Sequence, residues 1–385
     1  MPVAHGAAVA GIRDGALAFA PPDYETPLPA DMLAQYRAGR DPFALTGSPA
    51  LPMGLNLGAQ LHGLEARGLL DGATLLPWPQ YWAWWLSGEA VSEVTSLGCH
   101  SDLWAPAGAT FSPMAVRRGW AGRFAPMARA GEVIGTLRPH LAARTGLSPA
   151  VRIHAGLHDS NAALLAARAC PELAGKEATV LSTGTWFVAM RSPAMPVDLA
   201  ALPEGRDCLV NVDAAGRPVP SARFMGGREV ELLGERIDHA GLGGLADALI
   251  EGAMVLPTQV PGCGPFPAAV GRWIDRPADA PTRAATIALY AACMADTALD
   301  LIGASGALLV EGRFAASEIF VRTLASLRPG TQVYAASAGA DVSFGALTLA
   351  LPGLVPPGER IAVAPIGRDV AAYRDEWLDT IAAFA

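Results

Sequence analysis

Apolar residues recur at helical spacing in several stretches of the chain. Leucines three and four positions apart predict a helix within residues 55–70. The same spacing predicts a longer helix over 282–302, which Gly303 ends. An aromatic-rich run over 78–86, followed by Gly88, predicts another. These stretches indicate helices that each bury one face.

The second half of the chain alternates between short apolar runs and helical segments. Strands are predicted at 178–181 and 186–190, joined by a turn, and again at 307–310 and 332–334. Helices are predicted from about 226, 317 and 343. In the first half, a strand over 151–155 is predicted to lead through Gly156 into a helix. Residues 1–50 are rich in proline and are predicted to be irregular after a short strand. The alternation predicts an α/β fold.

Composition narrows the class of protein. The 385 residues suffice for two domains with their own cores. The chain is 51% apolar, but it has no run of 18 uncharged apolar residues and no basic region followed by an apolar core near its start, so we expect neither a membrane span nor a signal peptide. Its net charge of −8, with dispersed signs, disfavours a nucleic-acid surface.

The cysteines and the single lysine of the chain exclude further kinds of site. The five cysteines are far apart, odd in number and without a C-x-x-C pair, which predicts reduced thiols in a cytoplasmic protein and no zinc site or disulfide. Lys176 is the only lysine and is followed by Glu177, so the chain has no G-x-x-x-x-G-K-[ST] loop. Any nucleotide would be held by backbone amides, hydroxyls, arginine and Mg²⁺.

Asp159 is the candidate catalytic residue. It follows a predicted strand and opens a helix in the segment Gly-Leu-His-Asp-Ser. The unpaired N–H groups and the dipole at a helix start keep a carboxylate ionised, as removal of a proton from an alcohol requires. The alternative is a plain helix cap. His158 beside it could belong to a metal-binding pair, but the other histidines are scattered, so no metal ligand is expected.

Two further segments are candidate phosphate-binding sites. Ser182, Thr183, Gly184 and Thr185 form the predicted strand turn, where hydroxyls and a flexible glycine allow close approach of phosphate oxygens; an ordinary hairpin turn is the alternative. Gly226, Gly227 and Arg228 open a predicted helix, whose N-terminus with an arginine suits an anion, although a simple helix start explains them equally well.

The order and spacing of these motifs resemble the FGGY carbohydrate kinase family of the actin-like ATPase superfamily, most closely its fuculokinase-like and rhamnulokinase-like branch. Residues 54–61, 79–82 and 93–98 look like its first-domain landmarks, and 344–347 look like its closing Gly-Ala helix. The resemblance covers the chain. It implies a two-domain actin-like ATPase (ribonuclease H-like) fold with an N-terminal sugar-binding domain at 1–170 and a C-terminal nucleotide-binding domain at 171–385.

The resemblance also implies an activity and a set of site residues. It implies ATP-dependent phosphorylation of a sugar hydroxyl with Mg²⁺, in which Asp159 is the general base. Sugar-facing residues would be His5, Gly6, Gln80, Tyr81, Trp82, Glu93 and His158, because aromatic rings suit the apolar faces of sugars. For Glu93 and His100, a buried hydrogen-bond network is the alternative. Nucleotide-facing residues would be Ser182, Thr183, Gly184, Thr185, Gly226, Gly227, Arg228, Gly312 and Gly345.

The chain departs from the family pattern in two places. It lacks the opening Asp-x-Gly-Thr segment and begins with what looks like the fifth strand, so we expect an incomplete first domain that lacks roughly 60–80 residues. A mis-called start, a fragment and a remnant that only binds sugar or a partner all stay open. Residues 311–314 also occupy the place of the family's glycine-rich, adenine-binding turn. They lack its usual run of glycines, which leaves the nucleoside preference open.

The expected partner is a small sugar. The Trp-rich helix favours 6-deoxyketoses such as L-fuculose or L-rhamnulose over glycerol or xylulose, because a methyl group is well accommodated by aromatic walls. No nucleic acid or membrane partner is expected, and a homodimer stays open.

Overall fold

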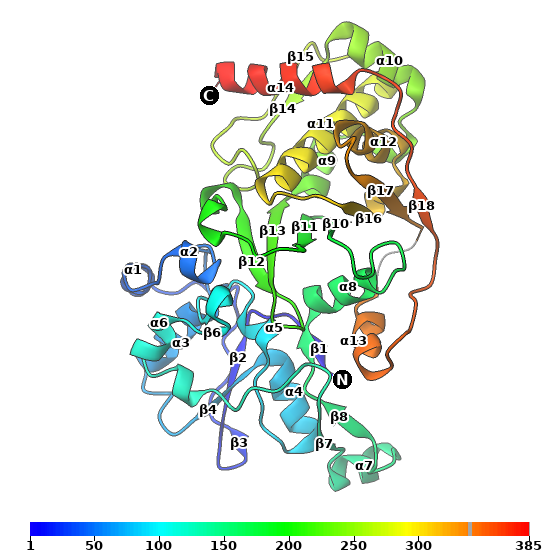
Figure 1. Cartoon of the computed structure of the whole chain (residues 1–385). Helices are drawn as coiled ribbons and strands as arrows, with labels where there is room; N and C mark the ends of the chain where they lie inside the picture. Colours follow the sequence, from blue (N-terminus) through cyan, green and yellow to red (C-terminus); the bar gives the residue numbers. More distant parts are fainter. Residues whose placement is uncertain (338–340, 385) are drawn as a thin grey trace.

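The computed structural model describes residues 1–337 and 341–384. Figure 1 shows two lobes stacked end to end. The first lobe contains the elements up to α8 (Asp159–Arg168), and the second contains those from β10 (Ala178–Thr183) onward, apart from α13 (Val342–Ala350).

The second lobe is built on one seven-stranded sheet. Its strand order is β12 (Cys208–Val212), β13 (Pro218–Phe224), β11 (Phe187–Ser192), β10, β16 (Ala307–Gly312), β17 (Gln332–Ala336) and β18 (Arg360–Ala362). The three strands β10, β16 and β17 are parallel, and the other pairs are antiparallel. This mixed sheet confirms the predicted α/β class.

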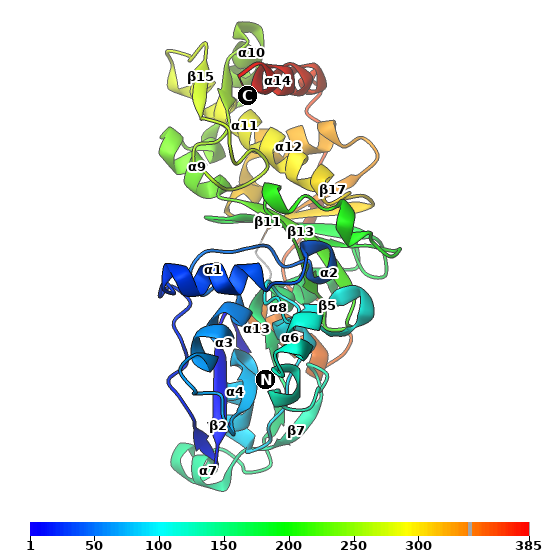
Figure 2. The ribbon, with the colours of Figure 1, turned by 90° about the vertical axis from the view of Figure 1, so that its left-hand side faces the viewer.

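Helices cover the sheet on the side away from the first lobe (Figure 2). They are α9 (Gly226–Leu233), α10 (Leu242–Glu251), α11 (Ala280–Leu301), α12 (Glu318–Leu327) and α14 (Val370–Phe384), and the short hairpin β14 (Met254–Leu256) and β15 (Arg272–Ile274) lies among them. Their apolar faces meet in a core around the fully buried Tyr290, Phe320 and Trp377.

Helix α11 forms the centre of this core. Asp279 caps it, because its Oδ1 accepts a hydrogen bond from the Thr282 N–H at 2.9 Å. Among the described residues it is the one helix long and apolar enough to cross a membrane, but 89% of the apolar window is buried inside the protein. The helix is therefore apolar because it packs on every side.

The first lobe is made of shorter sheets. Strands β3 (Ala16–Leu17), β2 (Val9–Arg13) and β4 (Thr74–Pro77) form one of them, and β1 (Val3–Ala4) runs parallel to β9 (Leu157–His158). Two antiparallel pairs complete the strands: β5 (Trp104–Ala105) with β6 (Thr110–Phe111), and β7 (Val133–Thr136) with β8 (Arg152–His154). The helices are α1 (Ala30–Ala38), α2 (Phe43–Thr46), α3 (Leu57–Glu65), α4 (Trp78–Ser87), α5 (Val94–Leu97), α6 (Pro113–Arg117), α7 (Pro139–Thr145) and α8.

The lobes interlock through two segments from the second half of the chain. Helix α13 packs along α8, so closely that a Cβ on Gly345 would lie 1.7 Å from the Ala162 carbonyl oxygen. Val212, at the end of β12, is buried in the first-lobe core, and a Cβ on Gly98 would lie 2.4 Å from its Cγ2. The helix that begins with Asp159 is therefore held by a helix from the second half of the chain.

The predicted helices at 55–70, 78–86 and 282–302 are confirmed as α3, α4 and α11. The prediction that residues 1–50 are irregular is wrong, because they also form β2, β3, α1 and α2. Pro29 and Pro42 directly precede α1 and α2, where the fixed φ of proline and its missing N–H cost nothing.

Candidate active site

Asp159 follows β9 and begins α8, a helix that lies near the meeting of the two lobes (Figure 1). Its side chain is 43% exposed, and Oδ1 lies 3.2 Å from His158 Nε2. The same oxygen accepts a hydrogen bond from the Ser160 N–H at 2.6 Å. The helix N-terminus favours a negative charge here. This carboxylate is thus fixed by one oxygen and accessible to a small molecule.

The His158 ring is almost completely buried beneath Asp159, with 7% of its side chain exposed. Burial lowers the pKa of this imidazole, although the Asp159 carboxylate opposes the shift. Its Nδ1 lies 3.4 Å from Asn161 Nδ2, which can only donate. The proton of the neutral ring then resides on Nε2, which donates to Asp159.

Glu93 reaches the same junction through Thr95. Its Oε2 accepts hydrogen bonds from the Thr95 N–H at 3.0 Å and from the Thr95 hydroxyl at 2.5 Å. The Thr95 oxygen in turn accepts the His158 backbone N–H at 3.0 Å. The buried network that was the alternative for Glu93 is therefore present. Thr95 was not singled out in the sequence, where a threonine two residues after a glutamate carries no signal.

The charge state of Glu93 depends on its surroundings. The residue is 0% exposed, and burial raises the pKa of its carboxyl from 4.5 to about 7. Within the described chain, its Oε1 is buried without a hydrogen-bond partner. One oxygen of Glu93 thus supports His158 through Thr95, and the other is buried without a partner among the described residues.

His5 and Gly6 directly follow strand β1, which pairs Ala4 with His158. A Cβ on Gly6 would lie 2.1 Å from Cys99 Sγ and 3.1 Å from His158 Cδ2, so only glycine fits here. The His5 ring meets the Tyr24 ring edge-on at a centroid distance of 5.2 Å. The structure therefore brings His5 and Gly6 to Asp159 and adds Tyr24, which sequence reasoning missed because it lies in a proline-rich loop.

Only the N-terminal end of the aromatic helix α4 approaches His5. Trp78 lies 6.5 Å from the His5 ring and stacks on Tyr81 at 5.2 Å. Trp82 is 40% exposed, on the outer face of the same aromatic cluster. Gln80 is fully buried, and its Nε2 donates to the carbonyls of Ala155 at 3.2 Å and Gly156 at 3.1 Å. Gln80 thus ties α4 to the strand that leads to Asp159.

His100 and Arg223 extend the site toward the second lobe. Burial lowers the pKa of His100 to about 4, with further contributions from His158 and Arg223. Arg223, on β13, lies over the Trp186 ring at 5.1 Å and donates to Asp207 Oδ1 at 3.1 Å. A cavity of about 500 Å³ opens here, with residues 49–52 on one side and Trp186 and Arg223 on the other.

The turn between β10 and β11 packs on the turn that follows β16. The Thr183 hydroxyl donates to the Glu311 carbonyl at 2.6 Å and accepts the Phe314 N–H at 3.1 Å. A Cβ on Gly312 would lie 2.4 Å from the Thr183 carbonyl oxygen. The Thr183 side chain therefore joins the two turns and does not face outward.

The N-terminus of α9 lies against the same turn. A Cβ on Gly227 would lie 2.0 Å from the Gly184 carbonyl oxygen, and the Arg228 N–H donates to the Thr185 carbonyl at 3.3 Å. The Arg228 side chain is 53% exposed, with Nη1 3.6 Å from Glu231. The structure thus gathers Ser182 to Thr185, Gly226 to Arg228 and Gly312 in one place, whereas Gly345 lies apart from them, on α13 against α8.

The described residues contain no group of three or more His, Cys, Asp or Glu that could hold a metal ion. The five cysteines are free.

Comparison with known proteins identifies the family. A sequence model described as "Carbohydrate kinase FGGY, C-terminal domain" matches residues 175–357. None of the curated proteins matches the chain. The solved structure of a carbohydrate kinase from Novosphingobium aromaticivorans is 58% identical, with a TM-score of 0.96, over 100% of this chain and 84% of that one.

More distant structures share the fold alone. A xylulose kinase from Rhodospirillum rubrum is 18% identical, with a TM-score of 0.75, over 98% of this chain and 81% of that one. A Plasmodium falciparum glycerol kinase with ADP is 11% identical, with a TM-score of 0.75, over 98% and 82%. Members of the FGGY family of carbohydrate kinases are two-domain proteins of the actin-like ATPase fold that phosphorylate sugars with ATP. Because the whole of this chain aligns with the Novosphingobium kinase at 58% identity, it belongs to this family.

Proposed function

We propose that this kinase phosphorylates a hydroxyl of a ketose or 6-deoxyketose, such as L-fuculose or L-rhamnulose, with Asp159 as the general base. The observation that carries the proposal is the exposed Asp159 carboxylate, held through one oxygen at the start of α8. Residues 1–170 form the sugar-binding domain in this proposal, and residues 171–385 form the nucleotide-binding domain.

The residues around Asp159 suit proton abstraction. The neutral His158 ring donates to Oδ1 and leaves Oδ2 for the sugar hydroxyl. As the hydroxyl oxygen attacks the γ-phosphorus in line, its proton passes to the carboxylate. Glu93 and Thr95 act as positioning residues, because they hold the His158 backbone.

The sugar is expected to contact the groups that surround His158. His5, Gly6 and Tyr24 form one wall, and Trp78, with Tyr81 and Trp82 behind it, continues it with aromatic surface. Apolar C–H faces and a terminal methyl group pack well on such rings, and the unpartnered Glu93 Oε1 can accept a sugar hydroxyl. Gln80 supports this wall from behind.

The nucleotide phosphates are expected over Ser182 to Thr185 and the α9 N-terminus. Backbone N–H groups and Arg228 supply positive charge there. Mg²⁺ usually binds through substrate phosphates, waters and one or two carboxylates, and it would reach this site with the nucleotide. Gly312 admits the nucleoside in this arrangement, whereas the role proposed for Gly345 is to let α13 position α8. The free thiols support a cytoplasmic, reducing compartment.

A screen of sugar-dependent ADP release tests the proposed substrate class. Pentuloses, hexuloses, their 6-deoxy forms and glycerol are compared at equal concentration with ATP and Mg²⁺. We expect the highest kcat/KM for a ketose or 6-deoxyketose. Glycerol as the sole good substrate would overturn this assignment.

A further inference from the structure

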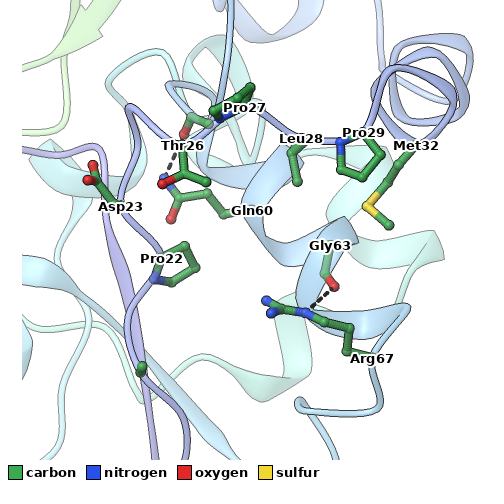
Figure 3. A pocket seen from close by; sticks show the side chains of 12 residues that line it. Pro22, Asp23, Thr26, Pro27, Leu28, Pro29, Met32, Gln60, Gly63 and Arg67 are labelled. Carbon is green, nitrogen blue, oxygen red and sulfur yellow. Dashed lines mark hydrogen bonds between the residues drawn. The ribbon is translucent and has the colours of Figure 1, made fainter.

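A second cavity lies on the first lobe, outside the group around Asp159. It has a volume of about 400 Å³ and lies between the proline-rich loop 20–29 and helices α1 and α3 (Figure 3). Its walls are mostly apolar and include Pro22, Leu28 and Met32. Cavities of this size hold small organic ligands.

One buried polar atom in this cavity has no partner. Gln60 is 3% exposed, and its Nε2 donates to the carbonyls of Ala7 and Gly54, both at 2.6 Å. Both contacts require the nitrogen, so the orientation of the amide is fixed. Its Oε1 is buried and, among the described residues, receives no hydrogen bond. A buried acceptor of this kind is costly unless a ligand or water donates to it.

One cation at the cavity is only partly engaged. Arg67 donates from Nε to the Gly63 carbonyl at 3.1 Å, and no carboxylate in the described chain pairs with its terminal nitrogens. Figure 3 shows its guanidinium and the Gln60 amide turned toward the same space beside Pro22. Asp23 lies at the opposite rim, where its Oδ1 accepts the Glu25 N–H at 2.9 Å.

We propose that this cavity binds a small amphipathic organic anion. Its acid group pairs with the Arg67 guanidinium, whose planar fork suits carboxylates and related oxyanions. An N–H or O–H of the ligand donates to Gln60 Oε1, and its apolar body packs on Pro22, Leu28 and Met32. An inorganic anion such as phosphate does not use the apolar walls, so an organic body is part of the proposal.

The cavity shares its wall with the sugar-facing group. The loop that closes it carries Tyr24, whose ring contacts His5 and whose carbonyl accepts the Gly54 N–H at 3.0 Å. Gln60 also holds the Ala7 carbonyl, two residues after His5. The same loop therefore forms one wall of the cavity and places Tyr24 against His5.

Binding of 8-anilinonaphthalene-1-sulfonate tests the proposal without any assay of activity. This probe combines a sulfonate, an N–H donor and apolar rings, and its fluorescence rises in an apolar site. We expect the full chain to show one saturable class of site whose Kd rises at least ~10-fold in Arg67→Gln, a loss typical of a charge-assisted bond. Met32→Trp, which fills the cavity, should weaken the same class.

The matched control is Arg144→Gln, which removes an exposed arginine of α7 outside the cavity and should bind the probe like the wild type. Circular dichroism and the urea midpoint confirm that each variant is folded, and Arg67→Gln keeps the comparison valid if Met32→Trp does not fold. Equal probe affinity of wild type, Arg67→Gln and Met32→Trp, or no saturable binding to the wild type, would overturn the proposal.

Discussion

At the scale of single residues, burial sets the charges around Asp159. His158 and His100 are held neutral by burial, and Glu93 has a pKa near neutrality, so the exposed Asp159 carboxylate is the group best placed to accept a proton. The sequence could suggest Asp159, because a carboxylate at a strand-to-helix junction has a recognisable pattern. It could not suggest Thr95 or Tyr24, because their roles come from tertiary contacts alone.

Glu93 should make stability depend on pH. Its folded pKa is raised from 4.5 to about 7, so in this interval the folded protein keeps a proton that the unfolded chain has lost. The free energy of unfolding therefore falls as pH rises through this window, by roughly 3 kcal/mol in total. Glu93→Gln keeps an acceptor for Thr95 and lacks this contribution. Urea unfolding from pH 4.5 to 8 measures the free energy of unfolding of both proteins. Parallel pH profiles for the two would contradict the raised pKa of Glu93.

Gly6 should tolerate no side chain while Cys99 is present. The Cβ of Gly6→Ala would meet Cys99 Sγ at 2.1 Å, and overpacking of this kind costs about 1–3 kcal/mol. Cys99→Ala removes the sulfur, so the double variant Gly6→Ala/Cys99→Ala should be destabilised by less than the sum of the two single variants. Chemical denaturation of all four proteins gives the coupling energy. Strict additivity would show that the two sites do not touch.

At the scale of elements, the close packing of α13 on α8 connects the end of the chain to the catalytic junction. The sequence predicted both helices from their apolar runs, but it gave no indication that they touch, because the contact joins segments almost two hundred residues apart. The family resemblance suggested a nucleotide contact for Gly345. In the structure this glycine lies where a side chain would meet the α8 backbone.

Gly345→Ala should separate the two helices. Its Cβ would lie 1.7 Å from the Ala162 carbonyl oxygen, and backbone cannot yield as a flexible side chain can, so we expect a loss of about 1–3 kcal/mol or more. Gly243→Ala in α10 is the matched control. No atom lies within 4 Å of that Cβ, and alanine favours a helix by up to ~1 kcal/mol. Thermal unfolding compares the stabilities of the two variants with that of the wild type. A Gly345→Ala variant more stable than the wild type would refute the close contact.

At the scale of the whole molecule, the strand and helix alternation and the long apolar α11 were enough to predict an α/β fold. The prediction failed where elements are short and surrounded by proline, as in α1 and α2, because local pattern is weak there and tertiary packing decides the structure. The interlocking of the lobes by α13 and Val212 also follows from packing that no local pattern records.

The two lobes have separate tasks in the proposed function: the first lobe supplies the base, and the second lobe holds the nucleotide. Asp159→Asn removes the base and keeps the size of the side chain. Asp198→Asn is the control, because Asp198 also accepts a backbone N–H at a helix start, yet lies in the second lobe away from Asp159.

The decisive measurement is sugar-dependent ADP release by wild type, Asp159→Asn and Asp198→Asn, together with nucleotide affinity by calorimetry. We predict that Asp159→Asn lowers kcat by at least ~10² to 10⁴, the usual contribution of a positioned base, while its nucleotide affinity stays within about twofold of wild type. Asp198→Asn should match the wild type in both. Turnover by Asp159→Asn equal to that of the wild type would contradict the assignment of Asp159 as the general base.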